Sequence, residues 1–232
     1  MIAGEKIIAH RGVFNNTTIP ENSMASFRRA IELFLPFELD VQLTKDNILV
    51  VFHDEDLTRM CGINKKIKDM TYDEIRNYRL LDTEEIIPRL SEVLELNNDM
   101  RLVDIEVKNT NRIQETVSEL LRCISGYTNV VVKSFSPKIV KKIKSKKPDL
   151  KVGYLITDNY NNFFKNLFLK KKFMINYCKP DFISISDKLF KTDKFNKLSQ
   201  KIPTQIWTIK YKVDVDNYND ITYICDNLPY NE

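Results

Sequence analysis

The protein has 232 residues, of which 43% are hydrophobic and 29% charged, proportions that are typical of a soluble globular protein. Five glycines and eight prolines exclude collagen-like and low-complexity chains. The formal net charge of +4 is compatible with an anionic substrate but lies well short of a nucleic-acid-binding signature, so we expect no nucleic-acid partner.

Short apolar runs alternate with longer amphipathic patterns along almost the whole chain. The predicted strands are Lys6–Ala9, Phe37–Leu43, Ile48–Phe52, Leu102–Val107, Val130–Lys133, Val152–Ile156, Phe182–Ile185, Gln205–Ile209 and Tyr223–Cys225. The predicted helices include Ser23–Leu35, Tyr72–Arg79, Ser91–Asn97, Arg112–Ile124 and Pro137–Lys146. Across residues 112–124, apolar side chains recur at spacings of three and four, which indicates one buried helix face.

This alternation of strands and helices predicts a parallel sheet covered by helices. About eight strand–helix units in 232 residues favour a closed (β/α)8 barrel over an open doubly wound sheet. A glycine-rich phosphate loop does not follow the first predicted strand, which weighs against a dinucleotide-binding fold. Because we find no linker, repeat or break in composition, we predict that residues 1–232 form a single α/β domain with the TIM-barrel fold.

The cysteines and the start of the chain indicate the cellular compartment. The four cysteines are far apart and form no Cys-x-x-Cys pair, so we expect reduced, buried thiols. Residues 1–6 lack a hydrophobic run behind their charge, which argues against a secretory signal. The sequence has no uncharged apolar run of about 18 residues, so we expect no transmembrane helix. These features predict a soluble, cytoplasmic protein.

The protein has only two histidines, and each follows an apolar, strand-like run. His10 follows Ile7–Ala9, and His53 follows Val50–Phe52. Because the carboxyl ends of the strands form the active-site rim of a barrel, we expect both histidines to face one mouth. A lone histidine is more often structural, but two at strand ends indicate general acid or base chemistry near neutral pH.

Carboxylates at alternate positions within two predicted strands indicate a cation site. Glu38 and Asp40 share one face of the first strand, and Asp104, Glu106 and Lys108 share one face of the second. A solvated edge strand would show the same alternation. However, inward-facing carboxylates need a positive partner, because like charges repel and buried charges are costly. Three oxygen ligands of this kind favour one divalent cation, Mg²⁺ or Ca²⁺, over zinc.

Together these residues resemble the glycerophosphodiester phosphodiesterase family over nearly the entire chain. The amino-terminal segments that carry the resemblance are His10-Arg11-Gly12, Pro20-Glu21-Asn22-Ser23, Glu38-x-Asp40, His53-Asp54 with Leu57 and Arg59, and Glu106-x-Lys108. The later segments are Ser134-Phe135, Trp207-Thr208-Ile209 and Cys225-Asp226-x-x-Pro229, and they are less specific.

The resemblance implies a TIM-barrel enzyme that hydrolyses glycerophosphodiesters to glycerol phosphate and an alcohol. The family's metal ligands match Glu38, Asp40 and Glu106, and its acid–base pair matches His10 and His53. Its phosphate-contacting cations match Arg11 and Lys108, and Trp207 matches a residue that lines the glycerol or head-group pocket. The residues do not indicate which histidine is the acid and which is the base.

Alternative functions remain open. The same site could act as a lysophospholipase D, which differs only in accepting an acyl chain. A barrel that binds phosphodiesters or anionic lipid without turnover is the rival from another class. A membrane-surface contact is a further hypothesis, based on lysines between residues 138 and 151 and on the apolar, lysine-rich segment Phe163–Met174. The plainer interpretation of both segments is a solvated helix face or core packing. The oligomeric state is left open.

Overall fold

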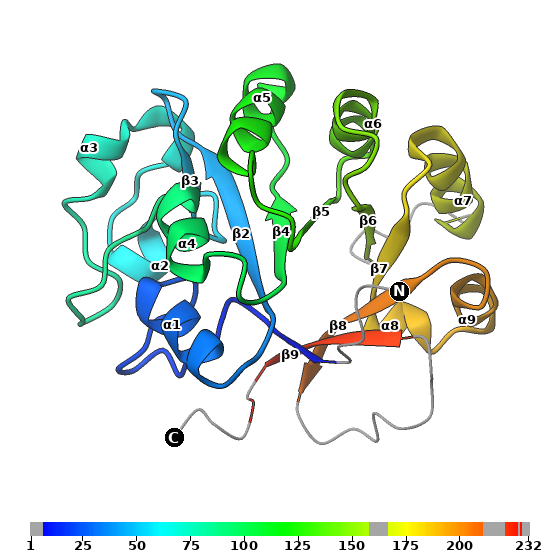
Figure 1. Ribbon diagram of the computed structural model, residues 1–232, viewed down its shortest axis with the longest axis horizontal. Coiled ribbons are helices and arrows are strands. Elements are labelled where there is room, and N and C mark those ends of the chain that lie inside the picture. Colours follow the sequence, from blue (N-terminus) through cyan, green and yellow to red (C-terminus); the bar gives the residue numbers. More distant parts are fainter. Residues whose placement is uncertain (1–6, 158–166, 211–220, 227, 229–232) are drawn as a thin grey trace.

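The strands of the protein close into a barrel (Figure 1). The computed structural model describes residues 7–157, 167–210, 221–226 and 228. Within these residues, eight parallel strands follow one another around the barrel, and β1 pairs with both β9 and β2 to close it. They are β1 (Ile7–Ala9), β2 (Phe37–Leu43), β4 (Val103–Val107), β5 (Val130–Ser134), β6 (Val152–Ile156), β7 (Phe182–Ser186), β8 (Thr204–Lys210) and β9 (Ile221–Asp226). The predicted TIM-barrel fold is therefore confirmed.

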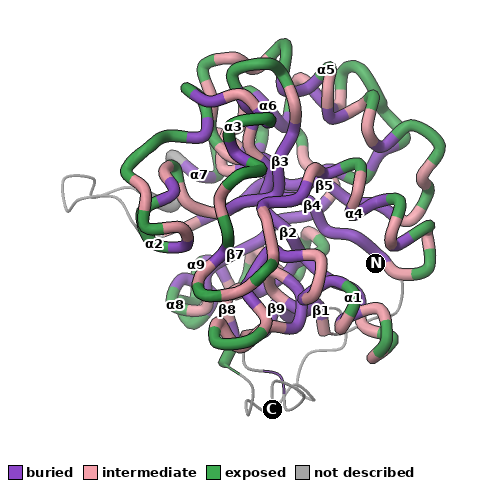
Figure 2. Tube along the Cα trace, turned by 90° about the vertical axis from the view of Figure 1, so that its left-hand side faces the viewer, coloured by how far each residue is buried: buried purple, intermediate pink, exposed green. Residues whose placement is uncertain are grey.

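Helices surround the barrel, so the strands are buried while the outer helix faces are exposed (Figure 2). The longer helices are α1 (Met24–Glu32), α4 (Leu90–Asn97), α5 (Ile113–Cys123), α6 (Pro137–Lys146) and α7 (Leu167–Cys178), and α8 (Asp187–Phe190) and α9 (Asp193–Ser199) follow β7. The α6 bounds are those that the sequence predicts, because Ser136 caps the helix and Pro137 occupies its first turn. On α6, Ile139, Val140 and Ile143 are buried, as expected for a helix with a solvated lysine face.

The alternation along β2 shows how the strands divide their side chains between two environments. Phe37, Leu39 and Val41 belong to the main hydrophobic core, which also includes side chains from the covering helices. Glu38 and Asp40 point the other way, into the barrel. A smaller apolar cluster of Ile8, Leu102, Val131, Phe182 and Ile224 is separate from the main core. Polar side chains can therefore enter the barrel only where this cluster leaves room.

One predicted strand lies outside the barrel. The segment predicted as Ile48–Phe52 forms β3 (Leu49–Val51), which turns back antiparallel to β2. It leads into α2 (Thr58–Cys61), a 3₁₀ turn η1 (Ile67–Asp69) and α3 (Tyr72–Ile75), and this excursion has its own small apolar core. The expectation that His53 follows a barrel strand is therefore wrong, because a hairpin and not a barrel strand delivers it.

The third helix is shorter than predicted. The periodicity predicts Tyr72–Arg79, but α3 ends at Ile75. Asn77 accounts for this early end, because its side-chain amide donates to the carbonyl of Asp73 at 2.7 Å. Asparagine competes in this way with the backbone hydrogen bonds that would continue a helix.

Some expectations concern residues outside the described part of the chain. Residues 1–6, which carry the argument against a secretory signal, lie outside it, and the described part of the apolar, lysine-rich segment begins with α7 at Leu167. Among the helices of the described residues, none has the length and apolar character that crossing a membrane requires.

Candidate active site

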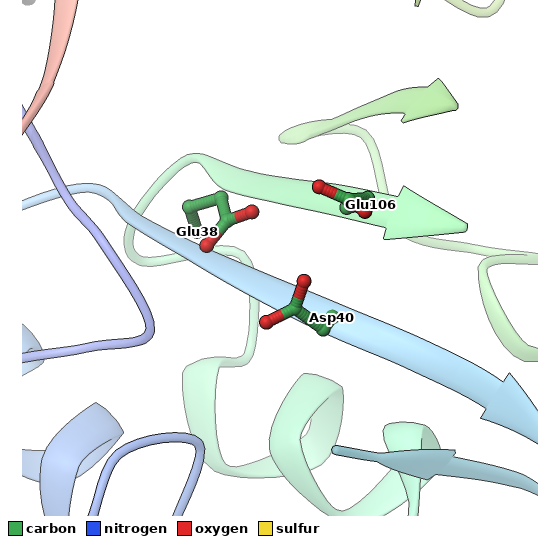
Figure 3. Close-up of side chains that lie close together, drawn as sticks. All are labelled: Glu38, Asp40 and Glu106. Carbon is green, nitrogen blue, oxygen red and sulfur yellow. The ribbon is translucent and has the colours of Figure 1, made fainter. Parts of the chain in front are cut away.

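Three carboxylates of β2 and β4 meet inside the barrel. Asp40 on β2 lies in register with Glu106 on β4, and Glu38 lies two residues earlier on β2. Figure 3 shows the three side chains on these two neighbouring strands. They are only 2%, 1% and 7% exposed for Glu38, Asp40 and Glu106, and each offers an oxygen within 4.8 Å of the others. The structure thus brings together the three residues that the sequence suggests as cation ligands.

Lys108 bridges two of these carboxylates. Its Nζ lies 2.6 Å from Asp40 Oδ1 and 2.7 Å from Glu106 Oε1. Burial alone would raise the pKa of Asp40, but nearby positive charge, led by Lys108, holds that pKa well below its usual range. The pKa of Glu106 is raised, first by burial and then by the charges of Asp40 and Glu38, although Lys108 opposes the rise. Repulsion among the three carboxylates favours a cation between them.

His10 lies between Asp226 and Glu38, one of the three carboxylates. Its Nδ1 lies 2.6 Å from Oδ1 of Asp226, the last residue of β9, and its Nε2 lies 3.9 Å from Glu38 Oε2. The two side chains meet because Ala9 of β1 pairs with Cys225 of β9. In the tautomer that carries hydrogen on Nδ1, His10 donates to Asp226, and its Nε2 faces Glu38.

His53 has a similar partner but a more open position. Its Nδ1 lies 2.7 Å from Asp54 Oδ1, and Asp54 Oδ2 accepts a hydrogen bond from Arg59 Nε at 2.6 Å. The His53 side chain is 35% exposed, whereas that of His10 is 14% exposed. His53 also lies close enough to Asp40 for its positive charge to lower the pKa of that carboxyl. Both histidines therefore lie near the three carboxylates, although only His10 follows a barrel strand.

Arg11 is held toward the site by a tight turn after β1. Its backbone lies in the left-handed region with φ of 55°, and Gly12 follows with φ of 81°. A Cβ on Gly12 would lie 2.5 Å from Ser26 Oγ, so only glycine fits this approach to α1. The turn lets the Arg11 amide donate to Glu38 Oε2 at 3.2 Å and brings Arg11 Nε within 3.4 Å of Asp40 Oδ2.

Glu21 connects Arg11 to Arg59, which lies on α2 in the excursion that begins with β3. Its Oε1 accepts hydrogen bonds from Arg11 at 2.7 Å and from Arg59 at 2.6 Å. Burial would raise the pKa of Glu21, but the Arg59 hydrogen bond and the Arg11 charge outweigh it and lower the pKa to about 2. Because Arg59 also holds Asp54, one network of charges orients both Arg11 and His53.

A second buried charge pair lies beside the three carboxylates. Lys133 on β5 is 1% exposed, and its Nζ lies 2.9 Å from Asp104 Oδ2 and 3.5 Å from Glu38 Oε1. Gln205 on β8 donates to the same Asp104 oxygen at 2.8 Å. Burial would lower the pKa of Lys133, but Asp104 and Glu38 outweigh burial and raise it. The positive partner that Asp104 was expected to need is therefore Lys133.

An aromatic pair joins β8 to the residue that follows β5. Trp207 on β8 packs edge-on against Phe135, with ring centroids 5.7 Å apart. The Trp207 Nε1 is buried and has no hydrogen-bond partner among the described residues. Phe135 also lines a cavity of about 830 Å³, together with Lys108, Asn109, Lys138 of α6 and other residues. Lys108 therefore contacts two of the three carboxylates and also lines this cavity.

Sequence reasoning assigned no role to several side chains of the site: Glu21, Arg59, Lys133, Gln205 and Asp226. Asp226 carries the clearest signal that was missed, because it follows a strand-like run just as His10 does. Glu21 and Arg59 stand within the segments that resemble the family. Lys133 and Gln205 give no such signal, since each is one polar residue in an otherwise ordinary buried strand.

The donor set of this site fits a hard divalent cation. Glu38, Asp40 and Glu106 are carboxylates, which Mg²⁺ and Ca²⁺ prefer. They are buried, and their oxygens converge within 4.8 Å of one another. Burial is the main cause of the raised pKa of Glu106, and the charges of Asp40 and Glu38 add to it; a bound cation would relieve that repulsion.

Comparison with known proteins gives the same fold and identifies relatives. A glycerophosphodiester phosphodiesterase of Caldanaerobacter subterraneus subsp. tengcongensis is 40% identical over 164 residues, which are 64% of this chain and 65% of that protein. A human lysophospholipase D is 34% identical over 161 residues, 63% of this chain and 50% of that protein. An Oleispira antarctica phosphodiesterase, solved with the product sn-glycerol-3-phosphate, superimposes with a TM-score of 0.79 at 20% identity, covering 94% of this chain and 92% of that one.

The matches to the two sequence relatives span between half and two thirds of those proteins' own lengths. The sequence profile of the glycerophosphoryl diester phosphodiesterase family matches residues 10–223, which include both histidines, the three carboxylates and Trp207. The chain therefore belongs to the glycerophosphoryl diester phosphodiesterase family.

Proposed function

We propose that the protein hydrolyses glycerophosphodiesters to glycerol 3-phosphate and an alcohol, with one divalent cation, Mg²⁺ or Ca²⁺. The observation that carries this proposal is the convergence of Glu38, Asp40 and Glu106, with His10 near Glu38 and His53 near Asp40. Family membership and the name of the 40% identical relative support the same reaction.

The cationic groups suit the charge of the substrate. A phosphodiester carries one negative charge, and more charge develops on its non-bridging oxygens as the nucleophile arrives. A cation held by Glu38, Asp40 and Glu106 would supply electrostatic stabilisation of that charge. Arg11 can contact phosphate oxygens bidentately, and Lys108 can add a point charge beside them. Trp207 and its neighbour Phe135 would line the pocket for glycerol or the head group.

The two histidines would move the protons. One takes the proton from the attacking oxygen, which is either water or the glycerol hydroxyl, and the other gives a proton to the leaving alkoxide. If the glycerol hydroxyl attacks, the product of this step is a cyclic phosphodiester, which water then opens to glycerol 3-phosphate in a second step. Both Nδ1 atoms lie within hydrogen-bond distance of an aspartate, Asp226 for His10 and Asp54 for His53. Such a partner sets the tautomer and leaves Nε2 for proton transfer.

The test is release of glycerol 3-phosphate from glycerophosphocholine and glycerophosphoethanolamine with Mg²⁺, with Ca²⁺ and with a chelator. We expect release only with a cation, and a loss of roughly 10²-fold or more in His10→Ala and His53→Ala. Lys191→Ala, at the exposed residue that follows α8, is the control and should retain full activity. Folded wild-type protein that releases no product from either substrate with either cation would contradict the proposal.

A lysophospholipase D activity is the second candidate, and the 34% identical human relative of that name favours it. The two activities differ in whether glycerol carries an acyl chain. Comparing kcat/KM for lysophosphatidylcholine and glycerophosphocholine distinguishes them, because the acyl chain should improve kcat/KM only if the mouth accommodates it.

A further inference from the structure

Asp104 and Lys133 form a fully buried ion pair within the barrel, next to the three carboxylates. Asp104 on β4 lies in register with Glu38 on β2, and Lys133 on β5 lies in register with Glu106 on β4. Asp104 is 0% exposed and Lys133 is 1% exposed. Lys133 therefore lies next to two of the three candidate cation ligands without belonging to the set.

Stability alone is a weak reason for such a pair. Removing two charges from water costs several kcal/mol for each ion, and well-packed apolar residues of similar volume often stabilise a core equally well. The neighbouring interior cluster shows that this barrel can be filled with apolar side chains such as Ile8, Val131 and Ile224. The contacts of Lys133 point instead to an effect on Glu38.

The two oxygens of Glu38 have different partners. Oε1 faces Lys133 Nζ at 3.5 Å. Oε2 accepts the Arg11 amide at 3.2 Å and faces His10 Nε2 at 3.9 Å. The carboxylate is therefore held from two sides, which fixes its orientation toward Asp40 and Glu106.

Asp104 is a fourth buried carboxylate that the same lysine keeps apart. Its Oδ2 accepts hydrogen bonds from Lys133 at 2.9 Å and from Gln205 at 2.8 Å. Its other oxygen, Oδ1, has no hydrogen-bond partner within the described part of the chain. Without the hydrogen bonds from Lys133 and Gln205, Asp104 would be a free carboxylate next to Glu38. It would then compete with the three candidate ligands for the cation.

We propose that Lys133 is a positioning residue of the cation site, which orients Glu38 and holds Asp104 away, so that three carboxylates and not four face the cation. This inference rests on the cation dependence given under the proposed function. Residues that orient metal ligands through such contacts typically change metal affinity 10- to 100-fold when they are replaced.

The test replaces both charges of the pair together. Lys133→Gln with Asp104→Asn leaves the net charge of the site unchanged, so any change in cation affinity reports the arrangement of the ligands and not the overall charge. We expect Ca²⁺ and Mg²⁺ to bind roughly 10-fold more weakly in isothermal titration calorimetry. We also expect kcat for glycerophosphocholine to fall while KM changes little.

A matched control removes a comparable pair far from the site. Lys144 Nζ lies 2.7 Å from Asp181 Oδ2 on the outside of the barrel. Lys144→Gln with Asp181→Asn is likewise charge-balanced, and its cation affinity should equal that of the wild type. If the first double variant does not fold, Lys133→Met with Asp104→Leu replaces it, since apolar pairs often stabilise such a position.

Two results would overturn the inference, and they differ. A folded, charge-balanced double variant that binds both cations as tightly as the wild type would show that the pair is only structural, even if its Tm falls. Wild-type protein that binds neither cation would refute the cation site itself, and with it the cation dependence of the proposed function.

Discussion

Each of the two histidines depends on a neighbouring aspartate for its orientation. The 2.6 Å contact between His10 Nδ1 and Asp226 Oδ1 joins residues from opposite ends of the chain. His53 uses Asp54, the next residue, which Arg59 holds in turn. At the scale of single residues, charged neighbours therefore orient both histidines: Asp226 for His10, and Asp54 with Arg59 for His53.

Asp226→Asn should lower kcat for glycerophosphodiester hydrolysis by roughly 10²-fold, the usual contribution of one acid–base group. The amide can still contact His10, but it neither fixes the same tautomer nor stabilises an imidazolium. Steady-state kinetics from pH 5 to 9 would show the fall in kcat with a shifted pH profile, while Tm stays close to that of the wild type. An unchanged pH profile would mean that Asp226 has no influence on His10.

Glu21 should make the stability of the protein depend on acid pH. Its pKa is lowered to about 2 from an ordinary value of 4.5, so its ionised form stabilises the folded state. The contribution, about 3 kcal/mol, is complete above about pH 4.5 and is lost as the pH falls toward 2. Glu21→Gln should reduce Tm at pH 7 and flatten the decline of Tm between pH 5 and pH 3. Equal slopes for the two proteins would contradict this assignment.

At the scale of secondary-structure elements, β6 and β7 pack closely at one glycine. Gly153 on β6 lies against Phe182 on β7, and a Cβ at Gly153 would lie 2.2 Å from Phe182 Cε2. Phe182 is one of the large, fully buried side chains of the protein. Residue 153 is thus a glycine because the Phe182 ring leaves no space for a side chain. The backbone freedom of glycine is not the reason.

Gly153→Ala should therefore destabilise the fold by about 1–3 kcal/mol, the usual cost of overpacking a core. The double variant Gly153→Ala with Phe182→Leu should recover part of the loss, because the smaller side chain gives way. Chemical denaturation with urea measures both values. If Phe182→Leu recovers nothing, the contact is not the cause of the destabilisation.

At the scale of the whole molecule, the carboxylates of the site concentrate negative charge in a protein whose formal net charge is +4. Arg11, Lys108 and Lys133 lie beside these carboxylates, but burial, followed by the charges of Asp40 and Glu38, still raises the pKa of Glu106. A ligand that binds only the folded protein stabilises it through mass action.

Saturation with Ca²⁺ or Mg²⁺ should consequently raise the stability of the wild type, by about 2.7 kcal/mol at a concentration of 100 Kd. For a chain of this size, such a change corresponds to a rise in Tm of roughly 5–10 °C. Differential scanning calorimetry with cation and with chelator measures it. Glu106→Gln should largely abolish the shift, and a shift of the same size in that variant would place the cation elsewhere.

Much of the fold could be predicted because its signals are local. The bounds of β2, β6 and α6 follow from runs of apolar residues and from a capping serine before a proline. The direction of β3 could not be predicted, because a short apolar run is the same in parallel and antiparallel pairing. The early end of α3 depends on one side chain, Asn77, which helical periodicity does not take into account.

By itself, the sequence determined the strand–helix alternation and the shared face of Glu38 and Asp40, since period two is a property of one strand. Only the tertiary structure decided that Asp226 reaches His10, that Lys133 contacts Glu38, and that a hairpin delivers His53. These contacts depend on the register between strands and on closure of the barrel. Both arise when distant segments pack together, so no local pattern of residues contains them.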